Sequence, residues 1–482
     1  MKQNHGSSLK KNFVYQMIYE ILIMIIPLVL SPYLSRVLGA EGLGTYAYYF
    51  VIANYFVLFS VLGLKNHGKR TIAQCRDDAD RLNLEFTNLA ILHIAISVIC
   101  CVAYIGYIFI FAADRFLSAL MGFMVLSGLF DISWLYFGLE KFKLTVFRSS
   151  IIKILTVAAI FIFVQTQEDL WAYCLIMSVG TLLGQLVLWI PLKKYVQWVK
   201  PDLTQITAHF KPVLLLFIPT IAVSLYKLLD KLMLGDMSNH EQLGFFDNAE
   251  KIVNFPVTII ASFGAVMLPR ISNMVEHKEN EESARYTKLS FYYIMWLAYA
   301  FAFGLAGIAH IFAPVFWGEE FRSVSVLVIG LCVTLPFVAF ANIIRTQFLI
   351  PFHKDTAFLS SVIAGAIVNI IINLIWIPKY GAWGAVIATI AAEWVVCMVQ
   401  MACVRKEMPV WGYLKQSFIF IPFAGILFAV VYGMGVLMDE SVCTLVLQIV
   451  IGMGVYLALS GAYFYYKKDE YFMKLIHRLL HR

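Results

Sequence analysis

Long apolar runs dominate this chain and exclude most folds. A helix needs about 20 apolar residues to cross the hydrocarbon core of a bilayer. Fourteen segments of the 482-residue sequence reach that length: 14–37, 43–64, 87–112, 116–139, 145–166, 170–192, 212–235, 243–268, 288–312, 323–347, 356–378, 382–404, 416–437 and 442–466. Only 14% of the residues are charged, against about 25% in soluble domains. We therefore predict an all-α polytopic membrane protein with about 14 transmembrane helices.

The basic residues lie on one side of the expected membrane. An even number of segments puts both termini on the same side. Outside the segments or, for Lys288, at the first residue of one, 27 lysines and arginines fall on the side of the termini and three on the other: Arg115, Arg322 and Lys379. Because cytoplasmic loops are enriched in Lys and Arg, we predict that both termini are cytoplasmic. This pattern accounts for the net charge of +7 without nucleic acid as a partner.

Two stretches of the sequence echo each other six segments apart. Arg36-Val37-Leu38-Gly39, followed by Leu43-Gly44, matches Lys231-Leu232-Met233-Leu234-Gly235, followed by Leu243-Gly244. The offset predicts two parallel six-helix repeats related by an axis along the membrane normal. We accordingly divide the chain into an N-terminal lobe (1–192), a cytoplasmic linker (193–211), a C-terminal lobe (212–404), and two further helices with a tail (405–482). The basic linker either lies on the anionic inner leaflet or simply joins the lobes.

Several ionisable residues lie inside the apolar segments. Such a residue costs about 2.5–3.5 kcal/mol at mid-membrane, so it is a functional candidate. Lys227, Asp230 and Lys231 share a helical face at i, i+3 and i+4, and the next segment repeats this spacing. The plainer alternative for an isolated cation is anchoring at the membrane interface. We expect a cationic cavity lined by Arg36, Lys227, Lys231, Lys251 and Arg345.

The acidic residues of these segments have two possible roles. A carboxylate there either binds a coupling H⁺ or Na⁺ or serves as a fixed counter-ion. The residues in question are Asp230, Glu20, Asp247 and Glu250. We find no metal-ligand spacing, phosphate-binding loop or nucleophile motif. The eight cysteines form no CxxC pair, so neither a metal nor another cofactor is expected.

Four short motifs resemble one family of membrane proteins. They are Pro32-Tyr33-Leu34-Ser35-Arg36-Val37-Leu38-Gly39, Leu228-Leu229-Asp230-Lys231-Leu232-Met233-Leu234-Gly235, Met267-Leu268-Pro269-Arg270-Ile271-Ser272 and Ile377-Pro378-Lys379-Tyr380-Gly381-Ala382-Trp383-Gly384-Ala385. With the four motifs in this order, the chain resembles bacterial polysaccharide (O-antigen-type) flippases over residues 1–466. These belong to the multidrug/oligosaccharidyl-lipid/polysaccharide exporter superfamily.

The resemblance implies two six-helix lobes that form a V and rock between inward- and outward-open states. It implies a monomer in the bacterial cytoplasmic membrane. The cargo would be an undecaprenyl-pyrophosphate oligosaccharide, flipped to the outer leaflet for a polysaccharide polymerase, in O-antigen, capsule or related synthesis. The glycan itself is not readable from the sequence.

Two other functions are weighed against the flippase. A drug/cation antiporter of the same superfamily usually has twelve spans and acidic cavity residues, whereas this chain has fourteen segments and clustered cations. A membrane-embedded glycan polymerase or acyltransferase would need a large external loop, and no loop here exceeds about 20 residues. We therefore expect a transporter, not an enzyme.

Overall fold

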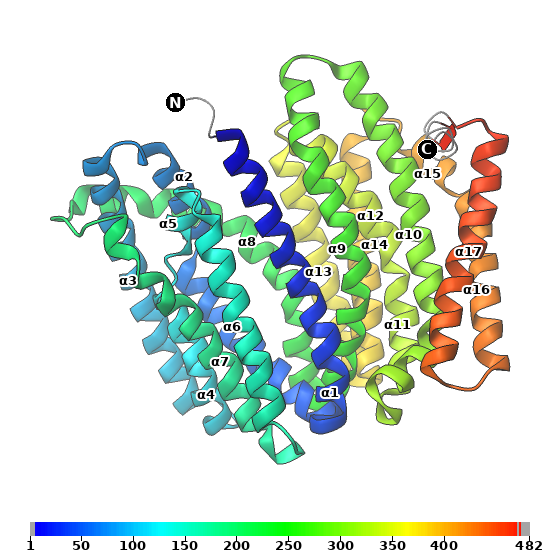
Figure 1. Ribbon diagram of the computed structural model, residues 1–482, viewed down its shortest axis with the longest axis horizontal. Helices are drawn as coiled ribbons and strands as arrows, with labels where there is room; N and C mark the ends of the chain where they lie inside the picture. Colours follow the sequence, from blue (N-terminus) through cyan, green and yellow to red (C-terminus); the bar gives the residue numbers. More distant parts are fainter. Residues whose placement is uncertain (1–4, 470–471, 474–482) are drawn as a thin grey trace. The chain divides into compact units, whose positions relative to one another are not determined.

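The computed structural model describes residues 5–469 and 472–473. Within these residues every regular element is a helix (Figure 1). Thirteen stretches in the described part are long and apolar enough to cross a membrane. This confirms the predicted all-α, multi-pass architecture, because only helices satisfy their own backbone groups within lipid when a barrel is absent.

The first two predicted segments lie in one long element. Helix α1 runs over His5–Val61 and is interrupted at Gly39, where φ is 67° and ψ is −177°. A side chain would be strained at that positive φ, so glycine fits the position. The kink separates the predicted segments 14–37 and 43–64. Side chains in α1 are described from Ile26 onward, and the first segment lies partly before that point.

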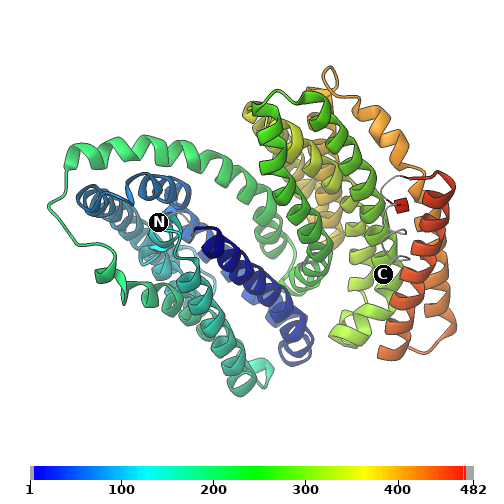
Figure 2. The ribbon, with the colours of Figure 1, turned by 45° about the horizontal axis from the view of Figure 1, so that its top comes forward.

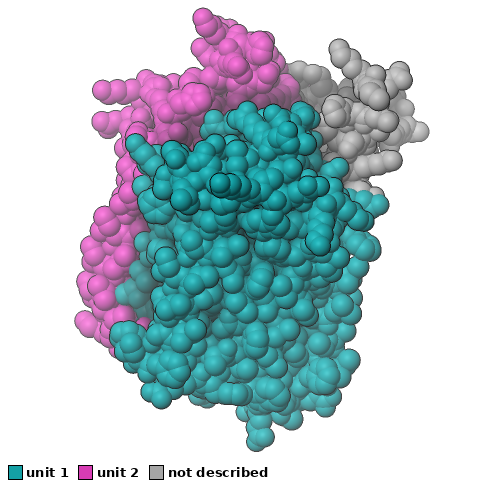
Figure 3. Space-filling view, turned by 90° about the vertical axis from the view of Figure 1, so that its left-hand side faces the viewer, with its two compact units in different colours: residues 1–235 teal, residues 236–482 magenta. Residues whose placement is uncertain are grey.

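The chain divides into two compact units, Met1–Gly235 and Asp236–Arg482 (Figure 3). Unit 1 contains α1 and most of α8 (Leu203–Met237), with six α-helices between them: α2 (Leu64–Cys75), α3 (Ala79–Ile110), α4 (Arg115–Leu129), α5 (Ser133–Gly138), α6 (Phe142–Phe163) and α7 (Leu170–Leu186). Helix α8 holds the predicted segment 212–235, which the repeat assigns to the second lobe. Internal contacts group that segment with unit 1, and the repeat itself stays a prediction.

The expected linker 193–211 is partly helical and is bound to α3. A short turn (Leu192–Lys194) precedes an extended stretch, and α8 begins at Leu203. Along the stretch, three backbone N–H groups donate to α3 side chains: Gln197 to Asn83 at 2.8 Å, Val199 to Thr87 at 3.2 Å, and Asp202 to Asn88 at 2.9 Å. The backbone N–H groups of an extended segment have no hydrogen-bond acceptor within that segment. Here side chains of α3 accept from them, as a neighbouring strand would in a sheet.

Unit 2 is built around two long antiparallel helices, α9 (His240–Glu276) and α10 (Asn280–Trp317). The other helices are α11 (Val324–Cys332), α12 (Thr334–Ile344), α13 (Asp355–Tyr380), α14 (Ala382–Val404), α15 (Val410–Ser417), α16 (Phe420–Leu437) and α17 (Val442–Tyr466), with a π-helical turn η5 (Arg345–Leu349) after α12. Figure 2 shows α16 and α17 as a hairpin at the edge of this unit. It packs on α10, where the Tyr456 hydroxyl donates to the Trp296 carbonyl at 2.7 Å.

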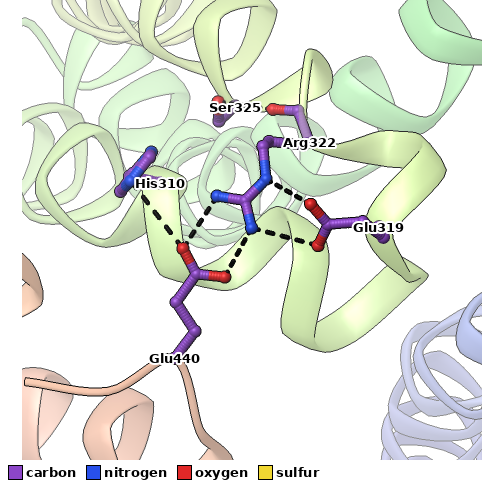
Figure 4. A network of polar contacts seen from close by, with 5 residues as sticks. All are labelled: His310, Glu319, Arg322, Ser325 and Glu440. Carbon is purple, nitrogen blue, oxygen red and sulfur yellow. Dashed lines mark hydrogen bonds and ion pairs between the residues drawn. The ribbon is translucent and has the colours of Figure 1, made fainter.

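A charged clamp fastens the turn between α16 and α17 (Figure 4). Arg322, in the connection between α10 and α11, donates to both oxygens of Glu440 at 2.7 and 2.6 Å. The same guanidinium donates to Glu319 at 2.6 and 3.0 Å. These two bidentate contacts use four of the five N–H donors of the planar guanidinium. Arg322 therefore has a structural partner on each side.

Candidate functional site

Helix α8 carries the first group of predicted site residues. Lys227 is exposed, Lys231 is half-buried, and Asp230 is only 4% exposed. The helix confirms that the three residues share a face, since α8 is continuous over Leu203–Met237. A lysine pair beside a buried carboxylate makes this stretch of an apolar helix polar and hydratable.

The second half of α1 lies beside α8 in unit 1. A Cβ atom on Gly235 would come within 2.5 Å of the Tyr48 ring, so the glycine permits this close packing. Two turns further along α1, the Tyr55 hydroxyl donates to the Ser224 carbonyl at 3.4 Å. The negative charge of Asp230 also acts on Tyr55. The aromatic face of α1 thus borders the polar face of α8.

Arg36 lies near the end of the first half of α1. It is exposed, and its Nη1 donates to the Pro32 carbonyl one turn earlier at 2.8 Å. This contact engages one of the five N–H donors of the guanidinium and aligns it along its own helix. The side chain is therefore held at the approach to the Gly39 kink.

Helix α9 carries the second group, in unit 2. The Lys251 ammonium is 2.6 Å from the Asp247 carboxylate, at the i, i+4 spacing that the sequence predicts for one face. Asp247 is 6% exposed, Lys251 is exposed and Glu250 is half-buried. The structure therefore pairs the Asp247 carboxylate with Lys251, and the two roles expected for Asp247 stay predictions.

Arg345 begins the π-helical turn η5. The guanidinium carbon is 5.8 Å from the centroid of the Phe358 ring, and the charge of Glu393 acts on it. Gln347 in the same turn is fully buried, and neither of its amide atoms has a hydrogen-bond partner within the described residues. Single π turns of this kind are frequent at functional sites, and η5 places a charged side chain and a buried amide in the predicted segment 323–347.

The structure groups the predicted residues by unit. Arg36, Lys227, Asp230 and Lys231 belong to unit 1, and the remaining described residues belong to unit 2: Asp247, Glu250, Lys251 and Arg345. The side chain of Glu20 lies outside the described residues. That all five cations line one cavity stays a prediction.

Sequence reasoning missed the charged contacts between distant segments. At the end of unit 1 formed by α2 and α5, His209 Nε2 is 3.1 Å from a Glu85 carboxylate oxygen, and His209 Nδ1 is 2.9 Å from His67 Nε2. The two histidines are separated by 142 positions, so no local spacing pairs them. The sequence holds a partial sign of this cluster. Residues 65–75 are largely polar and lie between two apolar segments, 43–64 and 87–112.

Comparisons with known proteins agree with this architecture. The family model described as "Polysaccharide biosynthesis protein" matches residues 9–275. A protein from Shigella dysenteriae named "Putative O-antigen transporter" is 22% identical over 82% of this chain and 100% of its own length. A protein of the same name from Escherichia coli K12 is 23% identical over 83% of this chain and 97% of its own.

Solved structures share the fold. The lipid II flippase MurJ in an inward closed conformation superposes with a TM-score of 0.75 at 16% identity, over 93% of this chain and 99% of that one. An inward-facing multidrug resistance transporter of the MATE family, of the MOP superfamily, gives a TM-score of 0.58 at 16% identity, over 83% and 96% of the two chains. At such identities the likeness concerns the fold. In the part of the chain that the structure describes, no three side chains are grouped to hold a metal ion.

Proposed function

Because the chain belongs to the family of polysaccharide biosynthesis proteins, we propose that it is a flippase for lipid-linked oligosaccharides. It moves an undecaprenyl-pyrophosphate oligosaccharide from the inner to the outer leaflet of the bacterial cytoplasmic membrane by alternating access, with both termini inside. The lipid tail stays in the bilayer while the head crosses. A polysaccharide polymerase on the outer side then takes the product, and the flippase acts as a monomer.

The observation that carries the proposal is the polar face of α8. It presents Lys227 and Lys231 on α8, directly after the apolar stretch Leu203–Leu225 that is long enough to cross the membrane. A pyrophosphate head carries about two negative charges, and removing its water without compensation costs several kcal/mol per charge. Cationic side chains in a wet cavity replace that hydration. A cationic drug would instead favour acidic lining residues, so the antiporter alternative fits α8 less well.

We propose that Arg36, Lys227, Lys231, Lys251 and Arg345 contact the head group during transport. Arginine binds phosphate through its fork, and lysine acts as a point charge. Binding must stay moderate, because a head group held too tightly would not be released outside.

The test is export after neutralisation of single cations. The host is a strain without the chromosomal gene, and the readout is surface glycan with membrane abundance measured in parallel. Arg36→Ala or Lys231→Ala should abolish export while insertion stays normal. The matched controls, Lys278→Ala and Lys406→Ala, remove loop cations and should export at wild-type level. Full export from the double variant Arg36→Ala, Lys231→Ala would refute the cationic-cavity model.

Transport by the Asp230→Asn variant distinguishes ion coupling by Asp230 from charge balance by Asp230. It is buried beside two lysines, so it either binds H⁺ or Na⁺ as the units move or neutralises the lysines permanently. In proteoliposomes, Asp230→Asn should abolish the dependence of transport on the ion gradient if Asp230 couples. Transport with unchanged ion dependence would assign Asp230 to charge balance alone.

A further inference from the structure

A second ionisable cluster is buried in unit 1, away from α8. Asp131 lies between α4 and α5 and is 3% exposed. Its Oδ1 accepts from the Ser133 backbone N–H at 3.0 Å, and its Oδ2 is 3.6 Å from the Lys65 ammonium. The Lys65 side chain is 62% exposed. One side of the carboxylate is therefore covered by protein, and the other reaches solvent through a lysine on α2.

His93 of α3 is the deeper member of the cluster. It is 1% exposed, and its ring contacts the backbone of Gly128 at the end of α4. The Nε2 atom is buried and has no hydrogen-bond partner within the described residues. With Nδ1–H assigned to the Gly128 carbonyl, Nε2 carries the lone pair. This imidazole has a vacant position for one proton.

The same three side chains supply the charges that act on His93 and on Asp131. Those that act on His93 are Asp131 and Lys65, and those that act on Asp131 are Lys65 and His93. The second half of α1 contributes the uncharged Ser60, whose hydroxyl accepts from Ser97 of α3 at 3.3 Å. A proton on His93 would thus meet one buried carboxylate and one solvent-exposed ammonium, and the carboxylate can neutralise it.

Polar groups continue from this cluster along α3. Ser97 is one turn beyond His93, and its Oγ also donates to the Ser60 carbonyl at 3.3 Å. A Cβ atom on Gly128 would come within 2.4 Å of the Ser60 hydroxyl. Glycine at position 128 therefore lets the Ser60 hydroxyl of α1 lie close to the end of α4.

We propose that His93 and Asp131 form a proton-binding site that is loaded from the Lys65 end of unit 1. A hydronium ion of the solvent gives up the proton: its O–H bond breaks and leaves water, and an N–H bond forms at Nε2 of His93. The charge of the resulting imidazolium is balanced by the Asp131 carboxylate. The use of this proton to drive transport rests on the proposed function, whereas binding itself does not.

Binding is tested on the full chain in lipid nanodiscs by ¹⁵N spectroscopy of labelled imidazoles. The chain has 10 histidines, and the signal that is absent from His93→Gln belongs to His93. We expect this signal to titrate as the pH is lowered, because the Nε2 lone pair has no hydrogen-bond partner within the described residues and accepts a proton. In Asp131→Asn its midpoint should fall, because the neighbouring negative charge is lost, and in Lys65→Gln it should rise, because a positive charge is lost. The opposite signs separate direct charge effects from loosening of the fold.

The matched control is His209→Gln, which removes a histidine of the other cluster in the same unit. It should leave the His93 midpoint unchanged. A His93 signal that stays constant over the whole range, or that moves in the same direction in Asp131→Asn and Lys65→Gln, overturns the proposal. Lys65 is exposed, so its variant keeps the test usable if Asp131→Asn fails to fold.

Coupling needs a separate measurement. In proteoliposomes, His93→Gln should remove the dependence of transport on a pH gradient, and Lys65→Gln should retain it with a shifted pH profile. The titration can behave as expected while His93→Gln transports with an unchanged pH dependence. That result would support proton binding at His93 and refute its role in coupling. If no variant of the chain transports lipid-linked glycans, the flippase proposal falls and the titration still decides the site.

Discussion

Gly63 is the position in unit 1 where one added carbon should have a severe effect. It joins α1 to α2 and lies against α8, the helix that carries Lys227 and Lys231. A Cβ atom there would be 2.2 Å from the Val213 carbonyl oxygen and 3.1 Å from the Phe217 amide nitrogen. Backbone atoms cannot rotate away. For Gly63→Ala the first distance must therefore lengthen by about 1.2 Å, from 2.2 Å to the 3.4 Å at which ordinary contact begins, and α8 must retreat.

Overpacking typically costs about 1–3 kcal/mol, and backbone neighbours place Gly63→Ala at about 3 kcal/mol. For a unit of more than 200 residues this lowers the unfolding midpoint by roughly 6–12 °C, measured by thermal fluorimetry in detergent. The matched control is Gly106→Ala in α3, where a Cβ atom meets nothing within 4 Å. Alanine there should stabilise the helix by about 0.5–1 kcal/mol. A Gly63→Ala protein that melts at or above the wild-type temperature would refute the steric argument.

Three further predictions concern contacts that hold each unit together. Arg148 of α6 donates to the Gly184 carbonyl of α7, so Arg148→Met should lower the unfolding free energy by about 1–3 kcal/mol. Arg322 lowers the pKa of Glu440 below its ordinary 4.5; the clamp therefore stabilises fully above pH 4.5, and this contribution is lost as the pH falls through the lowered pKa. The difference in melting temperature between wild type and Arg322→Gln should therefore shrink as the pH is lowered below 4.5. Asn88→Ala removes the acceptor of the Asp202 N–H, so chymotrypsin should cut the linker faster.

Exposed residues in the same unit supply controls for two of these predictions. Lys143→Met and Asn66→Ala alter exposed side chains and should leave melting and cleavage at wild-type values. Equal effects of Arg148→Met and Lys143→Met would contradict the role of the α6–α7 contact. For the clamp, a melting difference between wild type and Arg322→Gln that grows on acidification would contradict the assigned sign. Unchanged cleavage in Asn88→Ala would show that α3 does not hold the linker.

The helices were predictable because membrane spans follow from length and hydrophobicity alone. Segments such as 382–404 coincide with a helix, α14, to the residue. The kink at Gly39 was not predicted, since the Leu-Gly pairs around it also fit a short loop; only the positive φ in α1 decides between them. The linker's attachment to α3 escaped prediction for a different reason. Asn83, Thr87 and Asn88 are ordinary helix residues until an extended segment more than 100 positions away needs acceptors.

Pairing within a helix was predictable, and pairing between helices was not. The contact of Lys251 with Asp247 follows from the i, i+4 spacing. The contact of Lys65 with Asp131 joins two segments that the sequence analysis placed in different contexts, one a loop and one an apolar span. Burial explains why the second pair forms. A carboxylate in an apolar environment needs a cation or hydrogen-bond donor, and the fold can supply it from a distant segment. Such a partner lies outside any local spacing rule.

The cations of the two units differ in how much of their charge is already compensated. Arg322 is bound by two carboxylates, and the Lys251–Asp247 pair at 2.6 Å has no net charge, so each presents only a weak field to an approaching anion. Lys227 is exposed and makes no ion pair within the described residues. In a low-dielectric surrounding, an uncompensated charge attracts a phosphate far more strongly than a neutral pair does. Under the proposed function, we therefore expect Lys227→Ala to weaken export more than Lys251→Ala does, and equal export from the two variants would contradict this ranking.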